Sequence, residues 1–151
     1  MSPQPANQND PQQNIELRLR TMRILWLAMF TSIVLYYGFT FFVTPSENTD
    51  PDGRLFLILV VIALSITLVS FLIKNKLLSH AVEQQRVQLV QQAYIVALAL
   101  TEVAALLGLV YFFMTGDRYY PILFVIAACG QLLHFPRREH VINASSRKPV
   151  F

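Results

Sequence analysis

The chain is poor in charged residues, in cysteine and in the short motifs that accompany familiar chemistry. Asp, Glu, Lys and Arg make up 14% of its 151 residues, against roughly 25% in a typical soluble domain. A single cysteine, Cys129, excludes an internal disulfide and a CxxC metal site. The sequence contains no HExxH, no GxSxG and no glycine-rich phosphate loop. We therefore expect no enzymatic activity, no cofactor and no nucleic-acid partner.

The three histidines, His80, His134 and His140, are not spaced as metal ligands. His80 lies in a polar connection, and the other two lie where the last apolar run gives way to a basic segment. We expect His134 to be an amphipathic residue at a membrane interface, and we expect no metal site.

Apolar residues are abundant and are collected into four long runs. They make up 54% of the chain, and the mean hydropathy is +0.46. The runs cover residues 24–43, 55–73, 93–114 and 119–135. The first three have about the 20 residues that cross roughly 30 Å of hydrocarbon, and the fourth lies at the lower limit of that range. Because none alternates with a period of two, we predict an all-α membrane bundle of four up-and-down spans.

The remaining segments divide the chain simply. Residues 1–14 are rich in Gln, Asn and Pro and are predicted to be a disordered polar tail. Residues 15–136 form the membrane domain, and residues 137–151 form a basic tail. The 74–92 connection lacks Pro and Gly and spaces its apolar residues helically. We interpret it as helical extensions of two spans joined by a tight turn, with a solvated connector as the alternative.

Lysine and arginine lie mainly on one side of the predicted bundle. Ten fall in the N-terminal flank, the 74–92 connection and the C-terminal segment: Arg18, Arg20, Arg23, Lys74, Lys76, Arg86, Arg137, Arg138, Arg147 and Lys148. Two fall in the other connections: Arg54 and Arg118. Because basic residues accumulate on the cytoplasmic side, both termini are predicted to be cytoplasmic, in the inner membrane of a bacterium.

Glu102 interrupts the third run, in the stretch VALALTEVAALLGLV (96–110). At about 1.5 Å per residue it lies about 13 Å beyond Ala93, close to mid-bilayer. A lone carboxylate at that depth takes up a proton, so we expect a neutral, hydrogen-bonded acid. Glu102 is then either a structural polar residue or the candidate proton- or ion-binding group. The candidate hydrogen-bond partners are hydroxyls at a similar depth or on the neighbouring residue: Thr31, Ser32, Ser65, Thr67 and Thr101.

Small residues form a seam on one side of the third run, with Glu102 on its flank. The members are Ala97, Thr101, Ala104, Ala105 and Gly108. Small side chains at a four-residue spacing allow helix backbones to approach closely within a membrane. This seam is therefore predicted to pack against another helix, of the same chain or of a second one.

The stretch YIVALALTEVAALLGLVYFF (94–113) resembles the carboxylate-bearing helix of the ATP synthase c subunit, the proteolipid of the rotary ring. The similarity lies in the core residues 99–102 and in Gly108, Leu109 and Val110. Residues 55–114 match the hairpin of that family loosely, although the 55–73 segment has no glycine. The resemblance implies that Glu102 carries an ion. The layout of the whole chain resembles small four-span bacterial membrane proteins.

Two functional hypotheses follow. The first is a non-enzymatic membrane protein that acts through helix–helix association, as an accessory or oligomeric subunit. The second is a proton- or ion-coupled protein that works through Glu102. The expected partners are the lipid bilayer and either a second copy of the chain or a membrane complex.

Overall fold

The computed structural model describes residues 11–44 and 53–145. Within these ranges the chain forms five α-helices and no strand: α1 (Pro11–Phe39), α2 (Gly53–Glu83), α3 (Val87–Thr115), α4 (Pro121–Leu133) and α5 (Arg138–Ser145). The prediction of an all-helical chain is confirmed.

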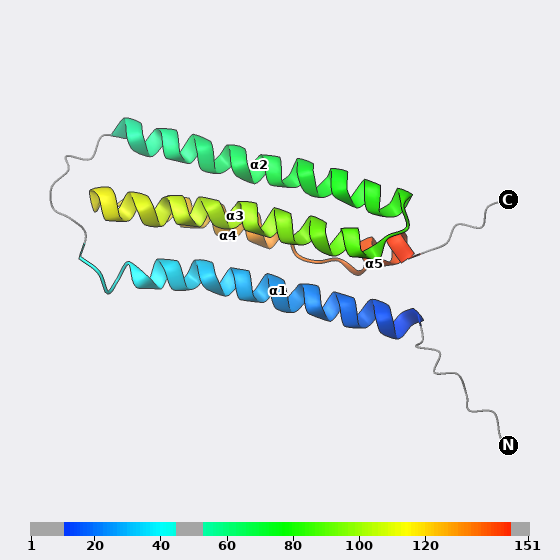
Figure 1. Ribbon diagram of the computed structural model, residues 1–151. Helices are drawn as coiled ribbons and strands as arrows, with labels where there is room; N and C mark the ends of the chain where they lie inside the picture. The colour runs from blue at the N-terminus through cyan, green and yellow to red at the C-terminus, as the bar shows by residue number, and fades with distance from the viewer. Residues whose placement is uncertain (1–10, 45–52, 146–151) are drawn as a thin grey trace, which may run out of the picture.

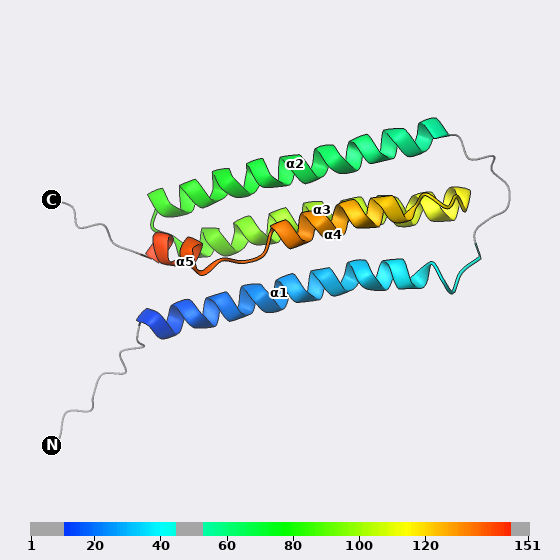
Figure 2. The same cartoon turned by 180° about the vertical axis from the view of Figure 1, so that it is seen from behind.

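The first four helices lie side by side along a common direction (Figures 1 and 2). α2 and α3 form an antiparallel hairpin, α4 returns along α3, and α1 packs against α3 and α4. The start of α1, the α2–α3 turn and α5 lie together at one end of the bundle. The end of α1, the start of α2 and the α3–α4 turn lie at the other end.

Three of the described helices are long and apolar enough to cross a membrane: Ile15–Phe39 within α1, then α2 and α3. Their outer faces carry large apolar side chains, and on α2 Leu68 and Leu72 remain 66% and 69% exposed. Soluble monomers rarely expose contiguous apolar patches of this kind. These features are those of a helical membrane protein.

The fourth predicted span forms a shorter helix than the 119–135 run suggested. α4 has 13 residues, which is about 20 Å, against roughly 30 Å of hydrocarbon. Proline sets both limits. Pro121 occupies the first turn, where its missing N–H costs nothing, while Pro136 disfavours helical backbone at the residue before it, so α4 ends at Leu133.

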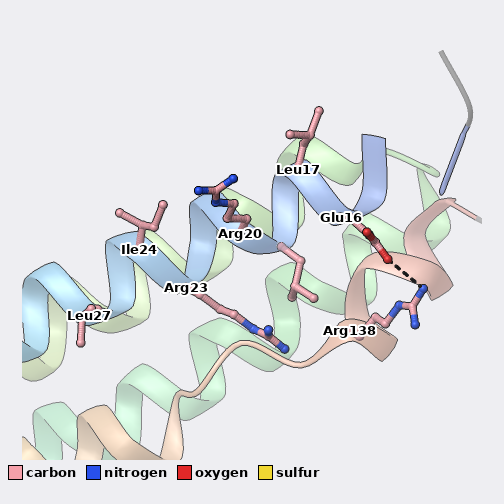
Figure 3. Close-up of a pocket in the computed structure, with 8 residues that line it drawn as sticks. Glu16, Leu17, Arg20, Arg23, Ile24, Leu27 and Arg138 are labelled. Carbon is pink, nitrogen blue, oxygen red and sulfur yellow. Dashed lines mark ion pairs between the residues drawn. The ribbon is translucent and has the colours of Figure 1, made fainter. Parts of the chain in front are cut away.

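α5 forms inside the segment that was predicted to be a basic tail. Val141 and Ala144 are fully buried there against Leu19 and Met22 of α1 and Val90 of α3. The Arg138 guanidinium also lies 3.7 Å from the Glu16 carboxylate (Figure 3). This satellite core, rather than the exposed ion pair, holds α5 in place.

The structure describes only part of the two predicted tails. α1 begins at Pro11, so the predicted polar tail 1–14 overlaps the helix by four residues. Residues 1–10 of that tail, and residues 146–151 of the basic one, lie outside the described residues.

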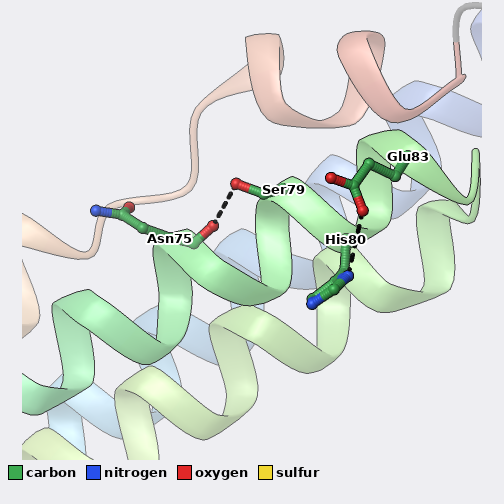
Figure 4. Close-up of polar contacts among 4 residues, drawn as sticks. All are labelled: Asn75, Ser79, His80 and Glu83. Atoms are coloured by element: carbon green, nitrogen blue, oxygen red, sulfur yellow. Dashed lines mark hydrogen bonds and ion pairs between the residues drawn. The ribbon is translucent and has the colours of Figure 1, made fainter.

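The α2–α3 hairpin has the form that the 74–92 segment predicted. α2 ends at Glu83 and α3 begins at Val87, so the turn occupies three residues. Gln85 supplies the left-handed backbone that reverses the chain, with φ of 50°. Near this tip Ser79 donates to the Asn75 carbonyl and His80 pairs with Glu83, both side chains exposed (Figure 4). The helical extension is therefore confirmed.

The structure buries every member of the small-residue seam on α3: Ala97, Thr101, Ala104, Ala105 and Gly108. A Cβ on Gly108 would lie 3.0 Å from Leu123 Cβ and 3.2 Å from the Phe124 ring. The seam is thus used within the chain, where it brings α3 and α4 into close contact.

Candidate functional site

Glu102 faces α1 at the middle of the bundle. Ser32 and Tyr36, one turn apart on α1, donate from their hydroxyls to Glu102 Oε1 at 2.6 Å and 3.1 Å. Residues four apart lie on the same helix face, so both hydroxyls reach one carboxyl. The carboxyl is half-buried and joins α1 to α3.

Of the five hydroxyl residues considered as partners, Ser32 meets Glu102. Thr31, Ser65 and Thr67 donate to carbonyls four residues back in their own helices. Hydroxyl side chains within helices commonly bond this way. Thr101 points away from Glu102 toward α4, and its hydroxyl is 2.6 Å from Gln131 Oε1. Depth alone therefore does not identify the contacts, because the helix face also decides them.

Tyr36 is the contact that the sequence prediction missed. Its aromatic ring near the end of an apolar run is typical of a membrane interface. The usable signal was its spacing of four residues from Ser32, which places two hydroxyls on one face of α1.

A second polar layer adjoins Glu102 and joins three helices. The Thr101 hydroxyl on α3 contacts Gln131 Oε1 on α4, and the Trp26 indole N–H on α1 donates to the Gln131 carbonyl at 2.8 Å. Gln131 is fully buried. In the described part of the chain its Nε2 has no hydrogen-bond partner.

The structure buries the His134 side chain among α2 and α4, where the sequence led us to expect an amphipathic residue at a membrane interface. Its Nδ1 lies 2.6 Å from the Gly130 carbonyl, and its Nε2 lies 3.2 Å from the Ser70 hydroxyl. The Phe71 ring packs 4.2 Å from the imidazole. Because α4 has already ended, the imidazole folds back to bond the last turn and α2, and so closes that helix end.

Lys74 follows Ser70 and Phe71 on α2, and its side chain is buried, with 7% of the residue exposed. Its ammonium lies 5.6 Å from the Phe71 ring centre and 5.4 Å from that of Tyr94. The faces of aromatic rings attract cations, and the apolar stem of lysine packs readily along apolar surface. This accounts for a lysine buried against α3 at the end of the bundle.

Tyr94 connects this region to α5. Its hydroxyl accepts from the Arg137 backbone N–H at 3.3 Å and lies 2.6 Å from His140 Nδ1. The Tyr94 hydroxyl can donate its hydrogen to Nδ1 only if that nitrogen carries no proton. A neutral His140 therefore fits the contact. Burial lowers the pKa of His140, the positive charges of Lys74 and Arg137 lower it further, and Glu139 opposes them.

This arrangement predicts that acid loosens α5. An unfolded histidine titrates near pH 6.5, and the folded pKa lies below that value. The stabilisation is therefore fully present above about pH 6.5 and is lost as pH falls through the folded pKa. We expect a modest fall in the midpoint of thermal unfolding in detergent between pH 7.5 and pH 5, since His140 is half-buried.

A His140→Asn variant is the matched control, because the asparagine carbonyl accepts from Tyr94 but does not titrate. Its midpoint should change less over the same pH range. Equal pH dependence in the two proteins would show that His140 is not the group responsible.

The candidate functional groups therefore form two polar layers, one around Glu102 and one around Gln131. A basic and aromatic cluster of Lys74, Tyr94 and His140 lies nearer the end of the bundle. In the described residues no group of three His, Cys, Asp or Glu side chains is placed to hold a metal ion. No family model, curated protein or solved structure matches the chain. The functional argument therefore rests on the contacts of these residues.

Proposed function

We propose that this protein is a non-enzymatic, multi-pass protein of the bacterial inner membrane. It acts through helix–helix association as an accessory or oligomeric subunit. The observation that carries the proposal is the direction of Glu102. Its carboxyl is turned toward hydroxyls of the same chain, so it acts as a polar strut between α1 and α3.

The Ser32 hydroxyl supports that role. Its one hydrogen is shared between the Met29 carbonyl at 2.8 Å and Glu102 Oε1 at 2.6 Å. The same hydroxyl therefore links the carboxyl on α3 to the backbone of α1.

The fourth crossing is part of the proposal. α4 alone is too short, but the irregular residues that follow it add length. Their backbone N–H groups are satisfied: His134 donates to the Gln131 carbonyl, Phe135 to Leu132, and Arg137 to the Tyr94 hydroxyl. Pro136 has no N–H and is buried. Non-helical backbone is tolerated at membrane depth where protein covers it.

The distribution of charge supports an orientation with both termini in the cytoplasm. Eight described basic residues belong to segments at the end of the bundle that holds the α2–α3 turn: Arg18, Arg20, Arg23, Lys74, Lys76, Arg86, Arg137 and Arg138. Arg54 and Arg118 belong to the opposite end. The positive-inside rule places the first end in the cytoplasm.

Substitution of Glu102 tests the role of this residue. Glu102→Gln keeps an acceptor for Ser32 and Tyr36, so we expect nearly unchanged stability. Glu102→Leu removes the acceptor and should lower the free energy of unfolding by about 0.6–1.7 kcal/mol, from the average to the highest value measured for hydrogen bonds between membrane helices. The measurement is reversible unfolding in bicelles. Ser65→Ala is the control, because that hydroxyl bonds within α2.

A second candidate function is proton or ion binding at Glu102. The observation that favours it is the pair of hydroxyls at one half-buried carboxyl, a group that can bind and release a proton. The test is proton flux into liposomes that hold the wild-type chain. Flux that is abolished in a folded Glu102→Gln variant would support this ion-coupled role instead of the strut. Flux equal to that of empty liposomes would support the strut.

A further inference from the structure

A groove of about 660 Å³ runs along α1 at the end of the bundle that holds α5. Its lining combines charge with apolar surface: Glu16, Leu17, Leu19, Arg20, Arg23, Ile24, Leu27 and Arg138. Figure 3 shows Arg23 directed toward the chain that leads to α5, with Arg138 on α5 itself. Neither the strut at Glu102 nor the buried polar layers use these residues.

The chemistry of the groove changes along its length. Glu16, Leu17 and Leu19 lie nearest the start of α1. Arg20 and Arg23 follow, and Ile24 and Leu27 continue along α1 toward the middle of the bundle. At about 1.5 Å per residue, Leu27 lies about 10 Å deeper than Arg20. Ile24 and Leu27 are 59% and 57% exposed, so the chain leaves this apolar surface uncovered.

The charged end has a surplus of positive charge. Three arginines meet one carboxylate, Glu16, which pairs with Arg138 at 3.7 Å. Both members of that pair are largely exposed, so it leaves the field of Arg20 and Arg23 almost intact. Arg23 is also braced, with its guanidinium 5.8 Å from the centre of the Phe135 ring. Guanidinium groups bind phosphate oxygens in bidentate fashion.

We propose that this groove binds one anionic phospholipid of the inner leaflet. Arg23 binds the phosphate, Arg20 and Arg138 add to the positive field, and an acyl chain lies along Ile24 and Leu27. The charge complementarity and the step from Arg20 and Arg23 to the deeper Ile24 and Leu27 match the layout of a lipid. The inference rests on the membrane placement proposed above but not on the role of Glu102.

Native mass spectrometry of the detergent-purified full chain tests the site. The probes are dioleoylphosphatidylglycerol and dioleoylphosphatidylcholine, titrated separately. We expect tighter binding of the anionic lipid, by about fivefold for each arginine engaged. An Arg20→Gln/Arg23→Gln variant should therefore bind it about 25-fold more weakly. Equal affinity for the two lipids would overturn the proposal.

The matched control is Arg54→Gln/Arg118→Gln, which removes the same charge at the opposite end of the bundle. It should bind the anionic lipid like the wild type. An equal loss in both double variants would show a general effect of net charge and would overturn the site. Arg20→Lys/Arg23→Lys keeps the charge in case the glutamine variant misfolds, and should bind with intermediate affinity because lysine lacks the bidentate fork.

The acyl-chain part of the site has its own variant. Leu27→Trp fills the apolar end and leaves the arginines, so lipid binding should fall at least fivefold. Competition by millimolar inorganic phosphate, together with an unaffected Leu27→Trp variant, would identify a free-anion site and overturn the lipid. Glu102→Leu, which tests the strut, should leave lipid binding unchanged. Failure of the lipid site can therefore be distinguished from failure of the strut.

Discussion

Replacing Gly130 with alanine is expected to lower the free energy of unfolding by about 1–3 kcal/mol, the usual cost of overpacking. The added Cβ would lie 2.9 Å from Thr67 Cγ2 and 3.0 Å from Thr101 Cγ2. Both neighbours are β-branched and stiff about χ1. Their hydroxyls are held by the Ala63 carbonyl and by Gln131. The helices must therefore separate, and reversible unfolding in bicelles measures the cost.

Two variants make this prediction specific. Gly38→Ala is the control, because a Cβ there meets nothing within 4 Å, and the better helix propensity of alanine should stabilise by up to about 1 kcal/mol. Thr67→Ser removes the Cγ2 methyl that the added Cβ would meet and keeps the hydroxyl. It should therefore recover part of the free energy of unfolding lost in Gly130→Ala. Equal effects of the two glycine substitutions would show that α2, α3 and α4 do not meet as closely as Gly130 indicates.

The helices themselves were predictable from the apolar runs, and their ends were less so. Uniform hydropathy locates a helix but does not say where it stops. Pro136 ended α4 before the apolar residues ended, although the residue that precedes a proline is a known boundary signal. α2 and α3 continue beyond hydrocarbon length because residues 74–92 contain neither Pro nor Gly.

α5 was not predicted, because its stability is tertiary. Eight residues are too few for an isolated helix in water, and REHVINAS has only Val141, Ile142 and Ala144 as apolar residues. Its stability comes from burying Val141 and Ala144 against α1 and α3. Contacts with α1 and α3, which both lie far from α5 along the chain, leave no local signal in the sequence.

The position of Glu102 was predictable, but most of its surroundings were not. Depth follows from counting residues, and it brought Ser32 into the candidate set. Partner choice depends on the rotation of each helix about its axis, which apolar runs do not encode. Thus Thr31 is adjacent to Ser32 in sequence, yet its hydroxyl bonds to the Leu27 carbonyl. The seam of small residues on α3 was easier to predict. Small residues at helical spacing indicate a close helix contact, whichever helix is the neighbour.

The second large effect is expected at Gln131, where a buried amide group costs stability. Its Nε2 is buried and has no hydrogen-bond partner among the described residues. Rotating the amide would leave a carbonyl in the same unpaired place. Gln131→Met has a similar volume and removes this group, so we expect stabilisation by about 1–3 kcal/mol, the cost of an unsatisfied buried polar group.

The other bonds of this layer should survive the substitution. Thr101 keeps the Leu98 carbonyl as an acceptor at 2.8 Å, and Trp26 donates to the Gln131 backbone, which methionine retains. Gln88→Met on the exposed face of α3 is the control and should change stability by less than about 0.5 kcal/mol. A loss of stability in Gln131→Met would contradict this prediction and would show that the contact of Gln131 Oε1 with Thr101 outweighs the unpaired Nε2.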